Sequence, residues 1–216
     1  MRITKFGHAG VRISSGDNTL VIDPGSFTER EAVDGATAVL VTHEHADHFD
    51  LDNLRATDAP VFTIDAVAGQ IASQAPDVRE RVTVVEPGEE FDAGLPVRAV
   101  GEWHAVIHPE LHRFRNSGFL VFAEEQALYH PGDAFTLPGQ RVDLLFTPVS
   151  GPWNKLAEVI DFARAVAAPR NVAIHELIYS EAGLNLADGR LSAMLGEREQ
   201  AYQRVKAGED VSTGSS

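Results

Sequence analysis

The chain has 216 residues, 44% of them hydrophobic, so it is long enough for one domain with a substantial core. The 32 acidic residues outnumber the 18 basic ones, and the formal net charge of −14 disfavours binding to nucleic acid or to anionic membrane surfaces. Cysteine is absent, which excludes disulfides and every thiolate-based metal site.

The first residues lack the apolar core of a signal peptide, and no stretch approaches the about 18 consecutive apolar residues of a membrane span. We therefore expect a cytoplasmic protein that does not insert into membranes. Residues 1–206 show neither a solenoid repeat nor a dividing linker, which predicts a single domain. Residues 207–216 are small and polar, as is typical of a flexible tail.

Three short apolar runs, separated by turn residues, predict an opening β-meander over residues 3–22. Asp23 follows the third run, where its carboxylate could accept hydrogen bonds that orient a neighbouring ligand loop; the alternative is an ordinary turn aspartate. His8 lies in a turn of small residues, where it could line a substrate pocket or satisfy the local backbone.

Three histidines and an aspartate fall within six residues, directly after a short buried strand expected over 38–42: His43, His45, Asp47 and His48. Side chains alternate along an extended chain, so the first three can share one side while a turn brings His48 to join them. Imidazole and carboxylate groups suit zinc and its first-row neighbours, and four of them are too many for one catalytic ion with an open position. The stretch therefore predicts two metals, against the alternative of a solvated histidine-rich turn.

Downstream, strand and helix patterns alternate, which predicts parallel pairing in this half of the sheet system. The elements expected there are a helix over 51–55 capped by Asp50, a strand over 61–64, a helix over 66–73 and a strand over 82–85. From residue 90 the pattern becomes hairpin-rich, and the last third alternates again. The elements expected there are strands over 96–100, 118–123, 127–129, 141–149 and 171–174, and helices over 156–166 and 191–205.

Four candidate ligands each follow the end of an apolar strand run: His43, His104, Asp133 and His175. An α/β sheet places its ligand groups at the carboxyl ends of its strands, so we expect these side chains to meet at one rim. A single histidine after a strand is usually structural, whereas four such groups together favour a functional site.

The series His43-Glu44-His45-Ala46-Asp47-His48, then His104, Asp133 and His175, resembles the ligand series of the metallo-β-lactamase superfamily. The HxHxDH element is highly specific, and the resemblance spans nearly the whole chain. It implies an α/β fold with four layers, an αββα sandwich of two mixed sheets with helices outside. The turns at 7–9 and 22–24 are most similar to the small metal-dependent hydrolases near L-ascorbate-6-phosphate lactonase.

The resemblance also implies roles for the site residues. The first metal would be bound by His43, His45 and His104, the second by Asp47, His48 and His175, and Asp133 would bridge the two. The ions would be two divalent metals, Zn²⁺ first, with Mn²⁺ and Fe²⁺ as alternatives. A bridging hydroxide would cleave an ester, lactone or phosphodiester bond of a small molecule, while Asp47 helps to steer the proton.

Two other functions stay open at this stage. One is a mononuclear iron oxidoreductase similar to persulfide dioxygenases, which also keep HxHxDH, and the other is a metal-binding module without catalysis. Assembly into a homo-oligomer is compatible with the sequence. His8, Trp153 and Lys155 are candidate substrate contacts, and His108 is a weaker one; His130 either supports the ligands or lies on the surface, and His112 reads as part of a solvated basic patch.

Overall fold

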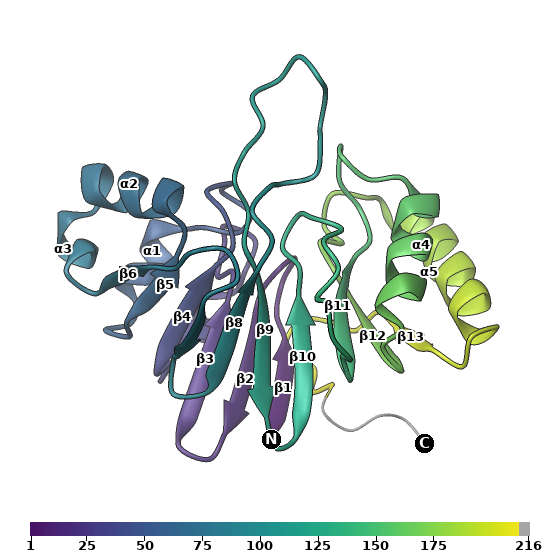
Figure 1. Ribbon diagram of the computed structural model, residues 1–216, viewed down its shortest axis with the longest axis horizontal. Coiled ribbons are helices and arrows are strands. Elements are labelled where there is room, and N and C mark those ends of the chain that lie inside the picture. Colours follow the sequence, from purple (N-terminus) through teal and green to yellow (C-terminus); the bar gives the residue numbers. More distant parts are fainter. Residues whose placement is uncertain (212–216) are drawn as a thin grey trace.

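Two mixed β-sheets pack face to face in the computed structural model, which describes residues 1–211 (Figure 1). The first sheet has the order β1 (Arg2–Lys5), β2 (Val11–Ser15), β3 (Asn18–Ile22), β4 (Ala38–Val41), β5 (Val61–Thr63) and β6 (Val82–Val84). The second has the order β13 (Ala201–Gln203), β12 (Arg170–Ile174), β11 (Leu144–Pro148), β10 (Gln126–His130), β9 (Gly118–Ala123), β8 (Pro96–Val100) and β7 (Glu90–Asp92).

Helices cover the outer faces of both sheets, which completes the four-layer α/β sandwich that the sequence predicts (Figure 1). The first sheet carries the short helix η1 (Arg30–Val33) and the helices α1 (Leu51–Arg55), α2 (Asp65–Gln74) and α3 (Pro76–Arg79). The second carries α4 (Leu156–Val166) and α5 (Glu181–Gly196). Among residues 1–211, no helix combines the length and the apolar character needed to cross a membrane.

Strand β4 shows why continuous apolar runs form the centre of each sheet. Ala38 and Leu40 join the core between the sheets, whereas Val39 and Val41 join the core under the outer helices. Successive strand residues face opposite sides, so a strand covered on both faces must be apolar at every position. β4 pairs in parallel with β3 and with β5, and β5 pairs in parallel with β6. The alternation of strand and helix patterns predicts such parallel pairing.

The strand directions bring one set of ends to a common rim. In the first sheet β1 and β3 both run antiparallel to β2, and β4 runs parallel to β3. In the second, β8 and β10 both run antiparallel to β9, and β11 and β12 run parallel to β10. The loops that follow β1, β3, β4, β8, β10 and β12 therefore leave their sheets at the same edge.

The expected closing helix over 191–205 is wrong in its bounds. Helix α5 starts ten residues earlier, at Glu181, where the Ser180 hydroxyl accepts a hydrogen bond from the Gly183 amide (3.3 Å). After Gly196 the chain turns and adds β13 beside β12. Gly183 and Gly189 weaken the helix signal ahead of residue 191, and packing of the α5 leucines in the core that they share with α4 overrides it.

Part of the expected flexible tail, 207–216, packs against the first sheet. The Gly208 amide donates to Lys5 O (2.7 Å) and the Val211 amide to Ile3 O (2.8 Å), so the segment runs along β1 and Val211 is buried. The rest of the expected tail, 212–216, lies outside the described residues. The chain thus remains part of the sandwich beyond the domain boundary expected at residue 206.

Gly25 allows a close approach beneath the histidine cluster, because a Cβ built there would lie 2.0 Å from Asp47 O. We predict that Gly25→Ala lowers the free energy of unfolding by about 1–3 kcal/mol, the usual cost of overpacking. Gly69 lies inside α2 with nothing within 4 Å of such a Cβ, so Gly69→Ala should instead stabilise by about 0.5–1 kcal/mol. Urea unfolding of both variants checks this; equal effects would contradict the packing argument.

Candidate metal centre

The seven side chains expected to bind metal meet at this rim. They belong to two groups in which one ligand atom from each residue lies within 4.8 Å of those of the others. The first group is His43, His45, His104 and Asp133, and the second is His8, Asp47, His48 and His175. Each group contains the three residues expected for one metal, plus one further residue.

Asp133 lies between the two groups. Its Oδ1 is 3.0 Å from His48 Nε2, while its Oδ2 is 3.1 Å from His175 Nε2 and 3.3 Å from His104 Nε2. The indole of Trp153 donates to the same Oδ2 (2.9 Å). One buried carboxylate therefore faces both groups, which is the arrangement that a bridging ligand requires.

A tight turn after β4 gathers the HxHxDH residues. The amides of His48 and Phe49 both donate to His45 O (3.0 and 2.9 Å), so the chain bends back after two extended residues. His43 Nε2 and His45 Nδ1 then lie 3.0 Å apart, and the bend turns His48 toward Asp133. This local geometry follows from strand alternation and one turn, as the sequence predicts.

Asp23 orients His48 and the adjacent Thr42 through hydrogen bonds. Its Oδ2 accepts hydrogen bonds from His48 Nδ1 (2.6 Å) and from Thr42 Oγ1 (2.8 Å), and its Oδ1 accepts from the Thr42 amide (2.8 Å). Thr42 Oγ1 also lies 2.9 Å from His43 Nδ1. A carboxylate that holds one ring nitrogen of a histidine fixes the direction of the other, and here that nitrogen faces Asp133.

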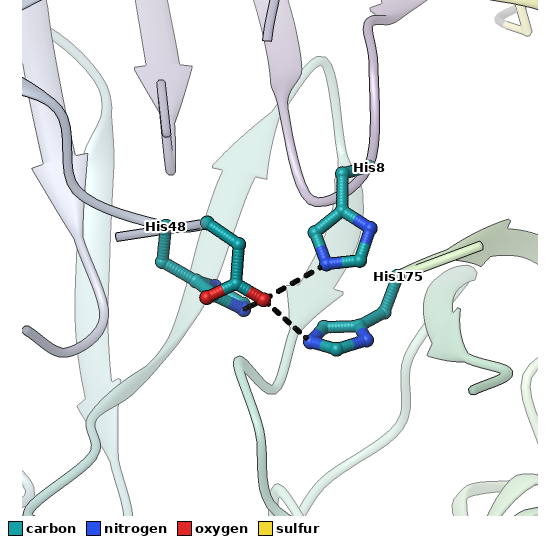
Figure 2. Close-up of side chains that lie close together, drawn as sticks. His8, His48 and His175 are labelled. Atoms are coloured by element: carbon teal, nitrogen blue, oxygen red, sulfur yellow. Dashed lines mark hydrogen bonds and ion pairs between the residues drawn. The ribbon is translucent and has the colours of Figure 1, made fainter. Parts of the chain in front are cut away.

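His8 is fully buried against Asp47 (Figure 2). Its Nδ1 accepts a hydrogen bond from the Leu177 amide (3.2 Å), so in the neutral ring the hydrogen is on Nε2, which donates to Asp47 Oδ2 (3.0 Å). His175 Nε2 approaches the same oxygen at 3.3 Å. In this tautomer Nε2 has no free lone pair, and His8 holds the Asp47 carboxylate in place.

An ion pair that the sequence analysis misses joins the two sheets beside His8. Lys5, at the end of β1, is fully buried, and its ammonium lies 3.0 Å from Glu176 Oε1. The same oxygen accepts from the His8 amide (3.2 Å), and the His175 amide donates to His8 O (3.0 Å). His8 and His175 both have positive φ (59° and 62°), so this network joins two residues whose backbone conformation is strained.

Charge and burial compete in the second group and at Asp133. Burial opposes ionisation of Asp133 and Asp47, but the neighbouring histidines hold the pKa of both carboxyls well below the usual range. Burial also disfavours the charged form of His48 and His175, yet the carboxylates outweigh it: Asp133 and Asp23 raise the pKa of His48, and Asp133 and Asp47 raise that of His175 to about 9. The carboxylates thus favour a positive charge at this position.

Burial lowers the pKa of two histidines in the first group. Burial, reinforced by neighbouring imidazoles, lowers the pKa of His43 well below its usual value and that of His45 to about 4. Both rings are therefore neutral at physiological pH, and a neutral ring has the lone pair that a metal ligand must offer.

Unpaired atoms show that the two groups fit metal ions. Among residues 1–211, four buried atoms at the centre make no well-directed hydrogen bond: Nε2 of His48, His104 and His175, and Oδ1 of Asp133. Such atoms cost about 1–3 kcal/mol each when left unsatisfied. Divalent ions that accept their lone pairs would remove that cost, and nitrogen and oxygen donors in this mixture suit Zn²⁺ and its neighbours.

The other predicted site residues differ in placement. Trp153 lies at the centre, with its ring 5.7 Å from that of His104, whereas the Lys155 side chain is 82% exposed and pairs with Glu158 (3.4 Å). Both line a cavity of about 390 Å³. His130 is buried and not on the surface: its Nδ1 accepts from the Gly132 amide (3.2 Å), and its Nε2 lies 2.9 Å from Ala9 O and donates to it.

The structural likeness to known proteins fits this architecture. Igni18, a metallo hydrolase of the archaeon Ignicoccus hospitalis, superimposes with a TM-score of 0.73 at 18% identity, covering 97% of each chain. CmlA, a diiron β-hydroxylase of Streptomyces venezuelae, gives a TM-score of 0.76 at 15% identity over 97% of this chain and 53% of its own. The two face-to-face sheets, with the candidate ligands at one edge, are those of the metallo-β-lactamase fold.

Sequence comparison gives the family. A model described as beta-lactamase superfamily domain matches residues 2–175. Protein Rv0786c of Mycobacterium tuberculosis is 39% identical over 201 residues, covering 90% of this chain and 92% of its own, and the UPF0173 metal-dependent hydrolase of Lysinibacillus sphaericus is 26% identical over 230 residues, covering 98% and 99%. The chain belongs to the metallo-β-lactamase superfamily, as its motifs predict; the branch near L-ascorbate-6-phosphate lactonase stays a prediction.

Removing the buried lysine should be costly. We predict that Lys5→Met lowers the free energy of unfolding by about 3–5 kcal/mol, because it leaves the Glu176 carboxylate buried without its partner. Lys5→Met combined with Glu176→Gln should recover much of that loss in guanidinium unfolding. Arg55→Met, which removes an exposed pair with Asp77, is the control and should have little effect. Additive losses in the double variant would argue against a coupled pair.

Proposed function

We propose that the protein is a metal-dependent hydrolase that holds two divalent ions, Zn²⁺ in the first instance, and cleaves an ester, lactone or phosphodiester bond of a small molecule. The position of Asp133 carries this proposal, because its carboxylate faces two groups of histidines at 3.0–3.3 Å. The likeness to the Lysinibacillus metal-dependent hydrolase and to the metallo hydrolase Igni18 supports a hydrolytic reaction.

His43, His45 and His104 would hold one ion, Asp47, His48 and His175 the other, and Asp133 both. Such ions supply an acidified water and a charge that polarises the bond to be cleaved.

The chain's own residues then control geometry and protons. Asp23 fixes the ring of His48, and Trp153 fixes the carboxylate of Asp133. Asp47 is the one carboxylate at the centre that is partly open to solvent, with a side chain 21% exposed, and His8 holds it from the buried side. It is therefore placed to accept a hydrogen bond from an attacking water and to help steer its proton outward.

The size of the adjacent cavities supports a small-molecule substrate. The cavity beside Trp153 has about 390 Å³ and a second one beside His104 about 270 Å³. The first volume lies at the lower end of the about 300–1,000 Å³ typical of ligand sites, and the second lies just below that range. The net charge of −14 makes a nucleic acid or an anionic membrane surface an unfavourable partner.

Elemental analysis combined with turnover tests the proposal. Wild-type protein should bind about two zinc or manganese ions and hydrolyse a model ester, lactone or phosphodiester. Asp133→Ala should lose metal and at least about 100-fold in turnover, because the shared ligand is gone. Asp161→Ala, on the exposed side of α4, is the control. One iron per chain with oxygen uptake would point to an oxidoreductase, and full metal loading without any turnover to a binding module.

Metal removal should also weaken the fold. We expect a chelator to lower the Tm of the wild-type protein, because ions that bind only the native state stabilise it by mass action. Asp133→Ala should show a much smaller chelator effect in the same calorimetric scan. An unchanged Tm in the wild-type protein would mean that the centre holds no tightly bound ion.

A further inference from the structure

The loop between β8 and β9 rises above the rim (Figure 1). Its neck is fixed: Trp103 and Arg115 form an antiparallel bridge, the His104 amide donates to Phe114 O (3.1 Å), and the Ala105 amide donates to Asp133 O (2.8 Å). The loop therefore begins and ends at the metal centre, and its position relative to that centre is set by backbone hydrogen bonds.

The tip of this loop surrounds a cavity of about 270 Å³. Its lining is largely apolar and includes Val106, Ile107, Pro109, Leu111 and Phe114. Val106 and Leu111 are 51% and 58% exposed, although the hydrophobic effect disfavours such exposure by about 25 cal/mol per Å². Neighbouring apolar side chains exposed around one cavity are typical of a ligand site.

This cavity adjoins the metal centre through His104. His104 lines it and also approaches Asp133, and the ring of Phe114 packs against that of His45, with 4.3 Å between centroids. A group bound in the cavity would lie beside His104. The bond to be cleaved would then follow on the side of His104 that faces Asp133.

The charges around the cavity favour a neutral occupant. None of the described residues that line it is acidic. The guanidinium of Arg113 is already engaged, since it donates to His104 O (2.9 Å) and lies 5.6 Å from the centroid of the Trp103 ring. The lining thus offers apolar area, and its one permanent charge already has partners within the loop.

A second, more polar cavity lies next to the first one. Residues 105–107 also line the cavity of about 390 Å³, whose other walls include Trp153, Asn154, Lys155 and Glu158. The two cavities thus share the segment that follows His104, and they differ in polarity. A molecule with one apolar and one polar end would use both.

We infer that the cavity of residues 104–114 binds an apolar acyl group, so that the substrates are esters or lactones with a hydrophobic acyl chain and a polar remainder directed toward Trp153. This inference rests on the proposed hydrolysis for the identity of the bond, but the cavity itself can be tested by binding alone. At about 270 Å³ it accommodates one part of a substrate and not a whole drug-sized molecule.

The test compares metal-loaded wild-type protein with Leu111→Asp, and with Leu186→Asp as the matched control on the exposed face of α5 (63% exposed). Binding of the neutral fluorescent probe N-phenyl-1-naphthylamine reports on the cavity. The ratio of kcat/KM for 4-nitrophenyl octanoate over 4-nitrophenyl acetate reports on acyl preference. Metal content is measured for each variant.

We expect the wild-type protein and Leu186→Asp to bind the probe and to prefer octanoate by about 10-fold or more, and Leu111→Asp to lose both with its metal retained. Probe binding that Leu111→Asp abolishes, without hydrolysis of any ester, lactone or phosphodiester, would support the cavity and refute the hydrolytic function. Ester hydrolysis with no probe binding in the wild type, or with the octanoate preference intact in Leu111→Asp, would overturn the inference and leave the hydrolase proposal standing.

Discussion

The carboxylate of Asp133 is the group on which the rest of the centre depends. It is buried, with three imidazole nitrogens and one indole N–H within 3.3 Å. The imidazoles come from loops after three different strands, and the indole comes from the segment between β11 and α4. A buried charge is expensive unless it is surrounded by compensating groups. The surrounding histidines, with Asp23 and Trp153 behind them, can be understood as the means by which the fold stabilises that charge and keeps its oxygens directed at both ligand groups.

The second constraint is mechanical. Each sheet supplies part of the centre, so the two sheets must keep a fixed relative position. The contact between His8 and the segment that follows β12 provides this, because three hydrogen bonds and the pair of Lys5 with Glu176 join the first loop of one sheet to a strand end of the other. Left-handed backbone at His8 and His175 costs of order 1–3 kcal/mol for each, and such strain persists only where the surroundings determine it.

Much of this architecture could be predicted from the sequence because its signals are local. The HxHxDH turn lies in six consecutive residues, and four strand runs end directly before a ligand or a few residues ahead of one. The long-range contacts could not be predicted in the same way: Lys5 and Glu176 are 171 residues apart, and each alone resembles a surface charge. The sequence predicts α5 ten residues too late, because its interior glycines have low helix propensity and tertiary packing stabilises the helix nonetheless.

The loop between β8 and β9 separates two tasks within one segment. Its neck hydrogen-bonds to the centre, whereas between residues 106 and 112 the backbone hydrogen bond at the tip is internal, from the Leu111 amide to His108 O (3.0 Å). Substitutions, insertions or deletions in the tip would therefore leave the geometry of the ligands unchanged. Evolution, or a protein engineer, could thus reshape substrate preference in this scaffold by exchanging a few residues at the tip.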